Sequence, residues 1–138
     1  VTGVFTVSQL VARHMIARKQ GKIINIASVM TRAARHMIGA YTTSKAAVAG
    51  LTRAMTAEWA QHGIGCNAIG PGYFSTALTA ALFTDEEFGA WLRNRTPAGR
   101  WGQVDDLVGA ALFLSSPASN YVNGHVLYVD GGMTATIG

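Results

Sequence analysis

The chain has 138 residues, of which 49% are hydrophobic and 13% are charged, so it can form one domain with a substantial core and is not a disordered tail. Its net charge is +4 and its pI about 9.6, but the basic residues are scattered, so we expect no nucleic-acid partner. No stretch reaches about 18 uninterrupted apolar residues, so we expect no membrane partner and a soluble, cytoplasmic protein.

The first two predicted elements are a helix and a strand. Apolar residues recur at helical spacing over residues 2–18, and the pattern stops at Gly21. Residues 22–27 are predicted as a short strand: after Lys22 they are apolar except for Asn25 and include three β-branched isoleucines, which is typical of a parallel strand covered on both faces. Ser28 follows where this strand ends, so we expect its hydroxyl to face a crevice at the carboxyl end of the strand.

A loop over residues 29–38 brings two cations close to Ser28. Arg32 and Arg35 are typical solvated loop charges, and that is the favoured interpretation. The alternative is that a guanidinium binds a carboxylate or phosphate of a substrate, because its planar fork suits bidentate pairing. Arg93 and Arg95, later in the chain, offer the same chemistry, and the sequence does not choose among the four.

The longest predicted helix covers residues 41–61 and carries few charges. A helix that is apolar nearly all round needs burial on more than one side, so we expect a sheet on one side and a second subunit on the other. Tyr41 and Lys45 are four residues apart at its start and stack on one face. A phenol is a weak acid at neutral pH, and a nearby cation stabilises its phenolate and eases proton transfer. Alone, such a pair is also a common exposed helical contact.

Residues 65–69 form the next predicted strand, with Cys66 as a core residue. The glycines at positions 63 and 65 have dinucleotide-motif spacing, but that motif needs the order strand, glycines, helix, and here a helix comes first. They therefore indicate a helix stop. Pro71 to Thr76 follow the strand, where a proline–glycine turn lets the backbone approach a flat ligand.

The remainder alternates polar and apolar segments. Residues 78–100 read as a small helical lid, with Thr84 as the cap of an acidic first turn and an aromatic stripe behind it. A final long helix is predicted over residues 101–114 and a last buried strand over 126–129. No metal site is predicted.

Three motifs occur together in family-like order: N-x-x-S at residues 25–28, Y-x-x-x-K at 41–45 and P-G-x-x-x-T at 71–76. The chain thereby resembles the short-chain dehydrogenase/reductase family. The resemblance implies an α/β fold, the carboxyl-terminal part of a doubly wound, Rossmann-type parallel sheet with flanking helices whose amino-terminal dinucleotide half is absent. It implies one partial domain over residues 1–138, with a helical substrate lobe at about 73–100.

The resemblance also implies reversible hydride transfer between NADP or NAD and a secondary alcohol or ketone. Ser28 would hold the carbonyl oxygen, Tyr41 would exchange a proton with it, and Lys45 would assist Tyr41 and grip the nicotinamide ribose. The implied cofactor contacts are Asn25, Tyr41, Lys45, Pro71, Gly72, Phe74 and Thr76. The residues that separate NAD from NADP, and an asparagine that holds a relay water, would precede Val1.

The lobe sequence, with its PGYF, WL, RTPA and RWG elements, is similar to the gluconate 5-dehydrogenase branch of that family. This implies a polyol or sugar-acid substrate, gluconate or 5-ketogluconate. One alternative is another carbonyl reductase of the family, such as a 3-oxoacyl carrier-protein reductase. The other is a non-catalytic fragment that only oligomerises. Homotetramers are common in the family, with helices 2–18 and 41–61 at the subunit contact.

Overall fold

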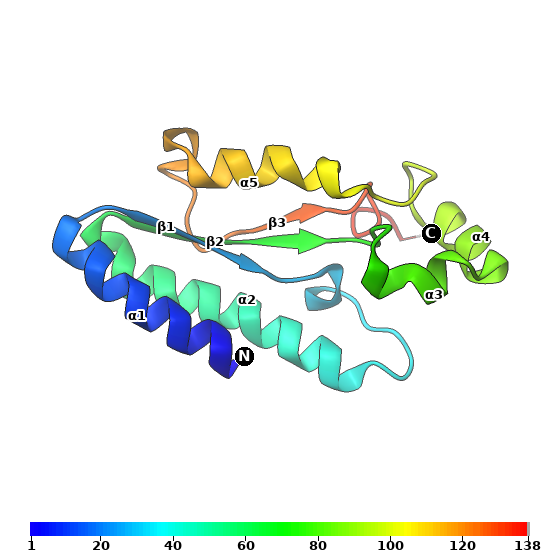
Figure 1. The fold of residues 1–138 in the computed structure, drawn as a ribbon, viewed down its shortest axis with the longest axis horizontal. Coiled ribbons are helices and arrows are strands. Elements are labelled where there is room, and N and C mark those ends of the chain that lie inside the picture. Colours follow the sequence, from blue (N-terminus) through cyan, green and yellow to red (C-terminus); the bar gives the residue numbers. More distant parts are fainter. Residues whose placement is uncertain (138) are drawn as a thin grey trace.

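A three-stranded parallel sheet forms the centre of the protein (Figure 1). The computed structural model describes residues 1–137, with strands β1 (Gly21–Ile26), β2 (Ile64–Pro71) and β3 (Val126–Val129) in the order β1-β2-β3. The carboxyl ends of parallel strands meet at the same edge of a sheet, so the residues that follow β1 and β2 lie near one another. The predicted α/β fold with a parallel sheet is confirmed.

Helices cover both faces of this sheet. Helices α1 (Thr2–Arg18) and α2 (Gly39–Trp59) lie on one face and α5 (Val108–Ser115) lies on the other (Figure 1). The first helix has the predicted bounds and ends at Lys19, which adopts a left-handed conformation at φ 52°. The second begins two residues earlier than predicted and finishes in a short 3-10 turn, η2 (Ala60–His62). Gly63 follows at φ 74°, so it is the helix stop predicted from the sequence.

Strand β1 and helix α2 pack in opposite directions along a shared core. The Nδ2 atom of Asn25 donates a 2.9 Å hydrogen bond to the Oγ1 atom of Thr52, and both side chains are buried. Two residues further along the chain, just past the strand, Ala27 shares a buried cluster with Val48, about one turn earlier in the helix. Each step toward the carboxyl end of β1 therefore corresponds to a step toward the start of α2.

Two short helices lie beyond the carboxyl ends of the strands: α3 (Ala80–Phe83), preceded by the 3-10 turn η3 (Ala77–Thr79), and α4 (Glu86–Arg95) (Figure 1). The predicted cap at Thr84 is wrong, because Asp85 adopts the extended N-cap conformation and its carboxylate accepts a 3.0 Å hydrogen bond from the Phe88 amide.

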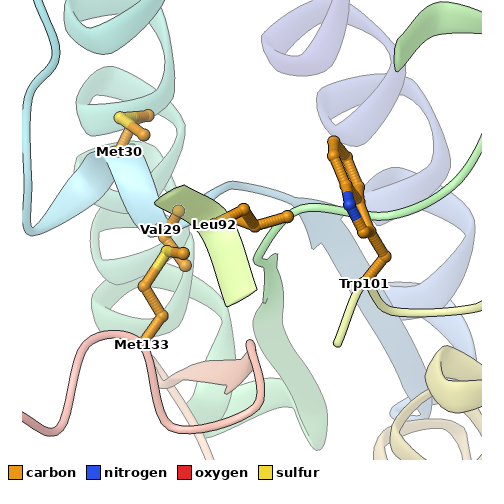
Figure 2. Close-up of a cluster of buried hydrophobic side chains, with 5 residues drawn as sticks. All are labelled: Val29, Met30, Leu92, Trp101 and Met133. Carbon is orange, nitrogen blue, oxygen red and sulfur yellow. The ribbon is translucent and has the colours of Figure 1, made fainter. Parts of the chain in front are cut away.

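One hydrophobic cluster holds α4 to the rest of the fold. Figure 2 shows Leu92 of α4 between side chains that come from three other segments. These are Val29, Met30, Trp101 and Met133. The loop that follows β1, helix α4 and the turn that follows β3 are thereby fixed relative to one another.

The predicted start of the last helix, at Trp101, is wrong. Helical structure begins with the 3-10 turn η4 (Val104–Leu107) and continues as α5. Residues 101 and 102 are extended because Gly102 bridges to Phe74, with its amide 2.9 Å from the carbonyl oxygen of Tyr73. Residues 115–120, predicted as a loop, contain the 3-10 turn η5 (Pro117–Ser119). Among residues 1–137, no helix has the length and apolar character that a membrane span requires.

Candidate active site

Ser28 lies just past the carboxyl end of β1 and starts a 3-10 turn, η1 (Val29–Thr31). Its backbone is extended, its side chain is only 6% exposed, and its Oγ atom accepts a 3.2 Å hydrogen bond from the Met30 amide. A hydroxyl that accepts one hydrogen bond still has its own proton to donate. The local turn therefore orients Ser28 and leaves its hydroxyl proton for a ligand oxygen.

Lys45 connects α2 to the same end of β1. Its Nζ atom donates a 2.9 Å hydrogen bond to the carbonyl oxygen of Ile26, the last residue of the strand. Tyr41 lies one helical turn, about 5.4 Å, closer to the start of α2. Helix α2 runs opposite to β1. A position nearer the start of α2 is therefore nearer the carboxyl end of β1, where Ser28 follows the strand.

The Tyr41 and Lys45 side chains are close, as their spacing predicts. The Nζ atom of Lys45 is 5.7 Å from the ring centroid of Tyr41, and the tyrosine is 46% exposed. The Lys45 ammonium is thus within cation–π range of the Tyr41 ring, and one of its N–H groups donates to the Ile26 carbonyl. This arrangement places a positive charge next to a phenol at the edge of the sheet. The catalytic roles of both residues stay predictions.

Tyr73 is a neighbour of this site that the sequence did not single out. Its ring makes edge-on contacts with Phe88, Trp91 and Trp101, with centroid distances of 5.5, 6.3 and 6.1 Å. Burial raises the pKa of Tyr73, while the Arg35 guanidinium opposes that shift and Tyr41 adds to it. Tyr73 therefore belongs to the aromatic group of the lobe and packs against the cluster that contains Val29 and Met30, the two residues after Ser28. An aromatic residue after a proline–glycine turn was the one available signal.

The loop that follows β2 lies against the turn that follows β3. The Gly72 amide donates a 2.9 Å hydrogen bond to the Val129 carbonyl, and a Cβ at position 72 would lie 2.9 Å from the Cα atom of Asp130. Glycine is required here because the two backbones approach so closely. Pro71 pairs with Val129 at the end of the sheet, and exposed Thr76 makes a side-chain contact of 3.1 Å with Thr79.

Two of the predicted cofactor residues are engaged in the core instead. Asn25 is 7% exposed and donates to Thr52, so its amide holds α2 against β1. Phe74 is also 7% exposed, and its ring packs directly over Gly102. The Asn25 amide already has a buried hydrogen-bond partner, and the Phe74 ring is already packed. Neither side chain is therefore exposed to a ligand in this structure.

The four arginines considered as substrate contacts fall into two groups. Arg32, Arg35 and Arg95 line a cavity of about 350 Å³ beside η1. Arg93 is not among them and faces a separate hollow near Phe83 and Trp101. The structure therefore brings three of the four together and separates the fourth.

Comparison with known proteins identifies the family of the chain. A model of the short-chain dehydrogenase/reductase family, described as enoyl-(acyl carrier protein) reductase, matches residues 1–134. The chain belongs to this family. The predicted resemblance is confirmed, and it covers nearly every residue.

Similar proteins within the family are gluconate dehydrogenases and reductases. A gluconate 5-dehydrogenase of Gluconobacter oxydans is 57% identical over 137 residues, which are 99% of this chain and 54% of that protein. A 5-keto-D-gluconate 5-reductase of Escherichia coli is 56% identical over 136 residues, again 99% and 54% of the two chains. A solved gluconate 5-dehydrogenase from Burkholderia cenocepacia, in complex with NADP and tartrate, matches 99% of this chain and 54% of that one, with 57% identity and a TM-score of 0.98. The chain thus spans about half the length of these relatives.

Proposed function

We propose that the whole protein that contains this chain catalyses NADP-linked, reversible hydride transfer, with D-gluconate and 5-keto-D-gluconate as the substrate pair. The contact between Lys45 and the Ile26 carbonyl carries the proposal, because it supports convergence of the ammonium and Tyr41 with Ser28 at the end of β1. Relatives at 56 and 57% identity act on this pair by name, and a similar structure holds NADP and a hydroxy acid, tartrate.

The proposed chemistry assigns one step to each side chain. In the direction of reduction, Ser28 donates a hydrogen bond to the carbonyl oxygen of the substrate, and Tyr41 transfers its phenolic proton to that oxygen as negative charge develops there. Lys45 stabilises the phenolate that remains. The reduced nicotinamide, when bound, supplies the hydride. In oxidation the phenolate removes the proton of the alcohol.

The residues present fit the nicotinamide end of the cofactor. A lysine ammonium has three N–H donors, and the contact with Ile26 uses one, which leaves two for ribose hydroxyls. We include Pro71, Gly72 and Thr76 as the loop that flanks the nicotinamide, because the loop follows β2 at the sheet edge where β1 ends. Asn25 and Phe74 are left out of this set because both are packed in the core.

We also propose that a second copy of the protein packs on α1 and α2. Helix α1 buries only Ser8 and Ala12, while Phe5, Val7 and Leu10 are 47, 62 and 52% exposed. Apolar faces of this kind in otherwise polar surfaces mark protein contacts. Replacing Leu10 with Glu is expected to lower the mass measured by light scattering, and an unchanged mass would contradict this contact. A cytoplasmic location is part of the same proposal, and cell fractionation tests it.

The function is tested by following NADPH absorbance in the presence of 5-keto-D-gluconate. NADH is the comparison cofactor, and an acetoacetyl thioester is the comparison substrate. The whole protein is expected to oxidise NADPH with 5-keto-D-gluconate and not with the thioester. The reverse preference would identify a 3-oxoacyl reductase. The 138-residue chain is assayed in parallel, and a chain that assembles without turnover would support the interpretation of a non-catalytic fragment.

A further inference from the structure

The cavity beside η1 has a composition that a neutral polyol alone does not require. Three arginines from two separate segments face it: Arg32 and Arg35 from the loop after β1 and Arg95 from the end of α4. We call it the arginine cavity. Its volume of about 350 Å³ falls within the range of roughly 300–1,000 Å³ found for small-molecule sites.

Within residues 1–137, these arginines have no acidic side-chain partner. No aspartate or glutamate lines the arginine cavity, and within residues 1–137 the ion pair that forms joins Arg100 to Asp106 instead. Arg32 lies 4.6 Å from the ring centroid of Tyr128, measured from its Cζ atom. Arg95 donates to the backbone and hydroxyl oxygens of Thr136 at 3.3 Å, which are neutral acceptors at the long end of the hydrogen-bond range. Among the described residues, three positive charges are thus held near one another without a negative side chain beside them.

Arg35 is the most constrained of the three. Its Cζ atom lies 5.2 Å from the ring centroid of Phe88, and its Nε atom is buried without a hydrogen-bond partner within residues 1–137. A buried donor on a charged group without a partner is costly, and cation–π contact offsets only part of that cost. A carboxylate is the ligand that fits, because its two oxygens match the guanidinium fork and supply the missing negative charge.

The arginine cavity adjoins the proposed reacting groups. Val29 and Met30, the two residues after Ser28, line it, and the Met30 amide holds the Ser28 hydroxyl at 3.2 Å. Tyr73 lines it as well. A molecule that places a carbonyl at Ser28 and Tyr41 can therefore extend its other end into this cavity.

We propose that the arginine cavity is the subsite for the substrate carboxylate, with Arg35 and Arg95 as its principal ligands, Arg32 at its rim and Arg93 outside it. The inference rests on the proposed function and explains why a sugar acid would be preferred. The enzyme would distinguish a sugar acid from the matching neutral polyol by the charge that the substrate carries at the end remote from the reacting carbon. D-Gluconate and D-glucitol are the matched pair, because they differ only in a carboxylate or CH₂OH at that end.

The test is the kinetics of oxidation of both compounds by the whole protein and by Arg35→Met, Arg95→Met and Arg93→Met. The first two substitutions are expected to lower kcat/KM for D-gluconate by about 10- to 100-fold each, the scale of a lost charge-assisted hydrogen bond, mainly through KM. They are expected to lower kcat/KM for D-glucitol much less, because a neutral CH₂OH group loses only a neutral hydrogen bond there. Arg93→Met, the matched control on the same helix, is expected to behave like the unmodified protein with both compounds.

Binding measured by calorimetry separates failure of the subsite from failure of the proposed function. Unmodified protein that turns over neither compound would contradict the proposed function, while tighter binding of D-gluconate than of D-glucitol that disappears in Arg95→Met would still support the subsite. Equal losses for the two compounds, or a loss in Arg93→Met alone, would overturn the subsite. Arg35→Lys keeps the charge and is expected to recover part of the binding of D-gluconate if Arg35→Met folds poorly.

Discussion

The Lys45 ammonium and the Ile26 carbonyl oxygen are joined by a 2.9 Å hydrogen bond that spans from helix α2 to the last residue of strand β1. The bond fixes the position of α2 along the direction of β1. It therefore also fixes how the neighbouring residues of the helix and the strand lie relative to one another. Ser28 follows Ile26 by two residues, and Tyr41 precedes Lys45 by one turn. One lysine thus serves the geometry of the site as well as its charge.

Replacing Lys45 with Met is expected to remove both contributions. Without the ammonium the Tyr41 phenolate loses its neighbouring charge, so we expect kcat/KM for 5-keto-D-gluconate to fall by about 100-fold or more, the lower end of the range for acid–base catalysis. Lys45→Arg keeps the charge with a different shape and should retain more activity. Circular dichroism checks that the fold persists, and wild-type turnover in Lys45→Met would contradict the assigned role.

Gly72→Ala tests the close approach of the two loops at the carboxyl edge of the sheet. A Cβ there would lie 2.9 Å from the Asp130 Cα atom, so a backbone has to move, and we expect a destabilisation of about 1–3 kcal/mol. Gly109→Ala in α5 is the matched control, because no atom lies within 4 Å of its added Cβ and a helical alanine is favoured over glycine by about 0.5–1 kcal/mol. Urea unfolding measures both, and equal effects would contradict the crowding at position 72.

The ion pair of Arg100 and Asp106 gives a prediction for acid pH. The guanidinium makes two hydrogen bonds, of 2.7 and 3.0 Å, with the carboxylate, and together with the Gln103 amide it lowers the pKa of Asp106 from 3.8 to about 2. A lowered native pKa adds stability above the unfolded value and loses it as the pH falls through the native one.

Unfolding of wild type and Asp106→Asn is therefore expected to differ at pH 6 and to converge as the pH falls from 3.8 to about 2. Both partners are substantially exposed, so the difference at pH 6 should be small. A difference between the two proteins that grows below pH 3.8 would show that another group dominates their acid response.

The elements predicted best are those with an uninterrupted pattern. Residues 2–18 show unbroken helical spacing and a basic end, and the structure has that helix with the same bounds. The strand over residues 126–129 is likewise confirmed. Both depend on local periodicity, which the chain itself displays.

The elements predicted poorly depend on contacts between distant residues. The sequence predicts residues 101 and 102 as the start of a helix. They are extended because Gly102 forms a bridge with Phe74. No local sequence pattern predicts that bridge, since its partner lies far away in the chain. Thr84 and Asp85 are both good caps, and only the backbone conformation decides between them.

The site divides in the same way. The four-residue spacing of Tyr41 and Lys45 made their proximity predictable, because helix geometry alone brings them together. Tyr73 joins the site through aromatic contacts with residues 15 to 28 positions later in the chain, and the grouping of Arg35 with Arg95 requires the lobe to fold back over η1. Such pairings become visible only in three dimensions.

Proton transfer by Tyr41 is tested by the rate of NADPH oxidation with 5-keto-D-gluconate by the whole protein and by Tyr41→Phe. The substitution removes one hydroxyl from a half-exposed ring and should leave the fold intact, while kcat falls by about 100-fold or more because the proton donor is gone. A Tyr41→Phe protein that turns over at the wild-type rate would contradict the account.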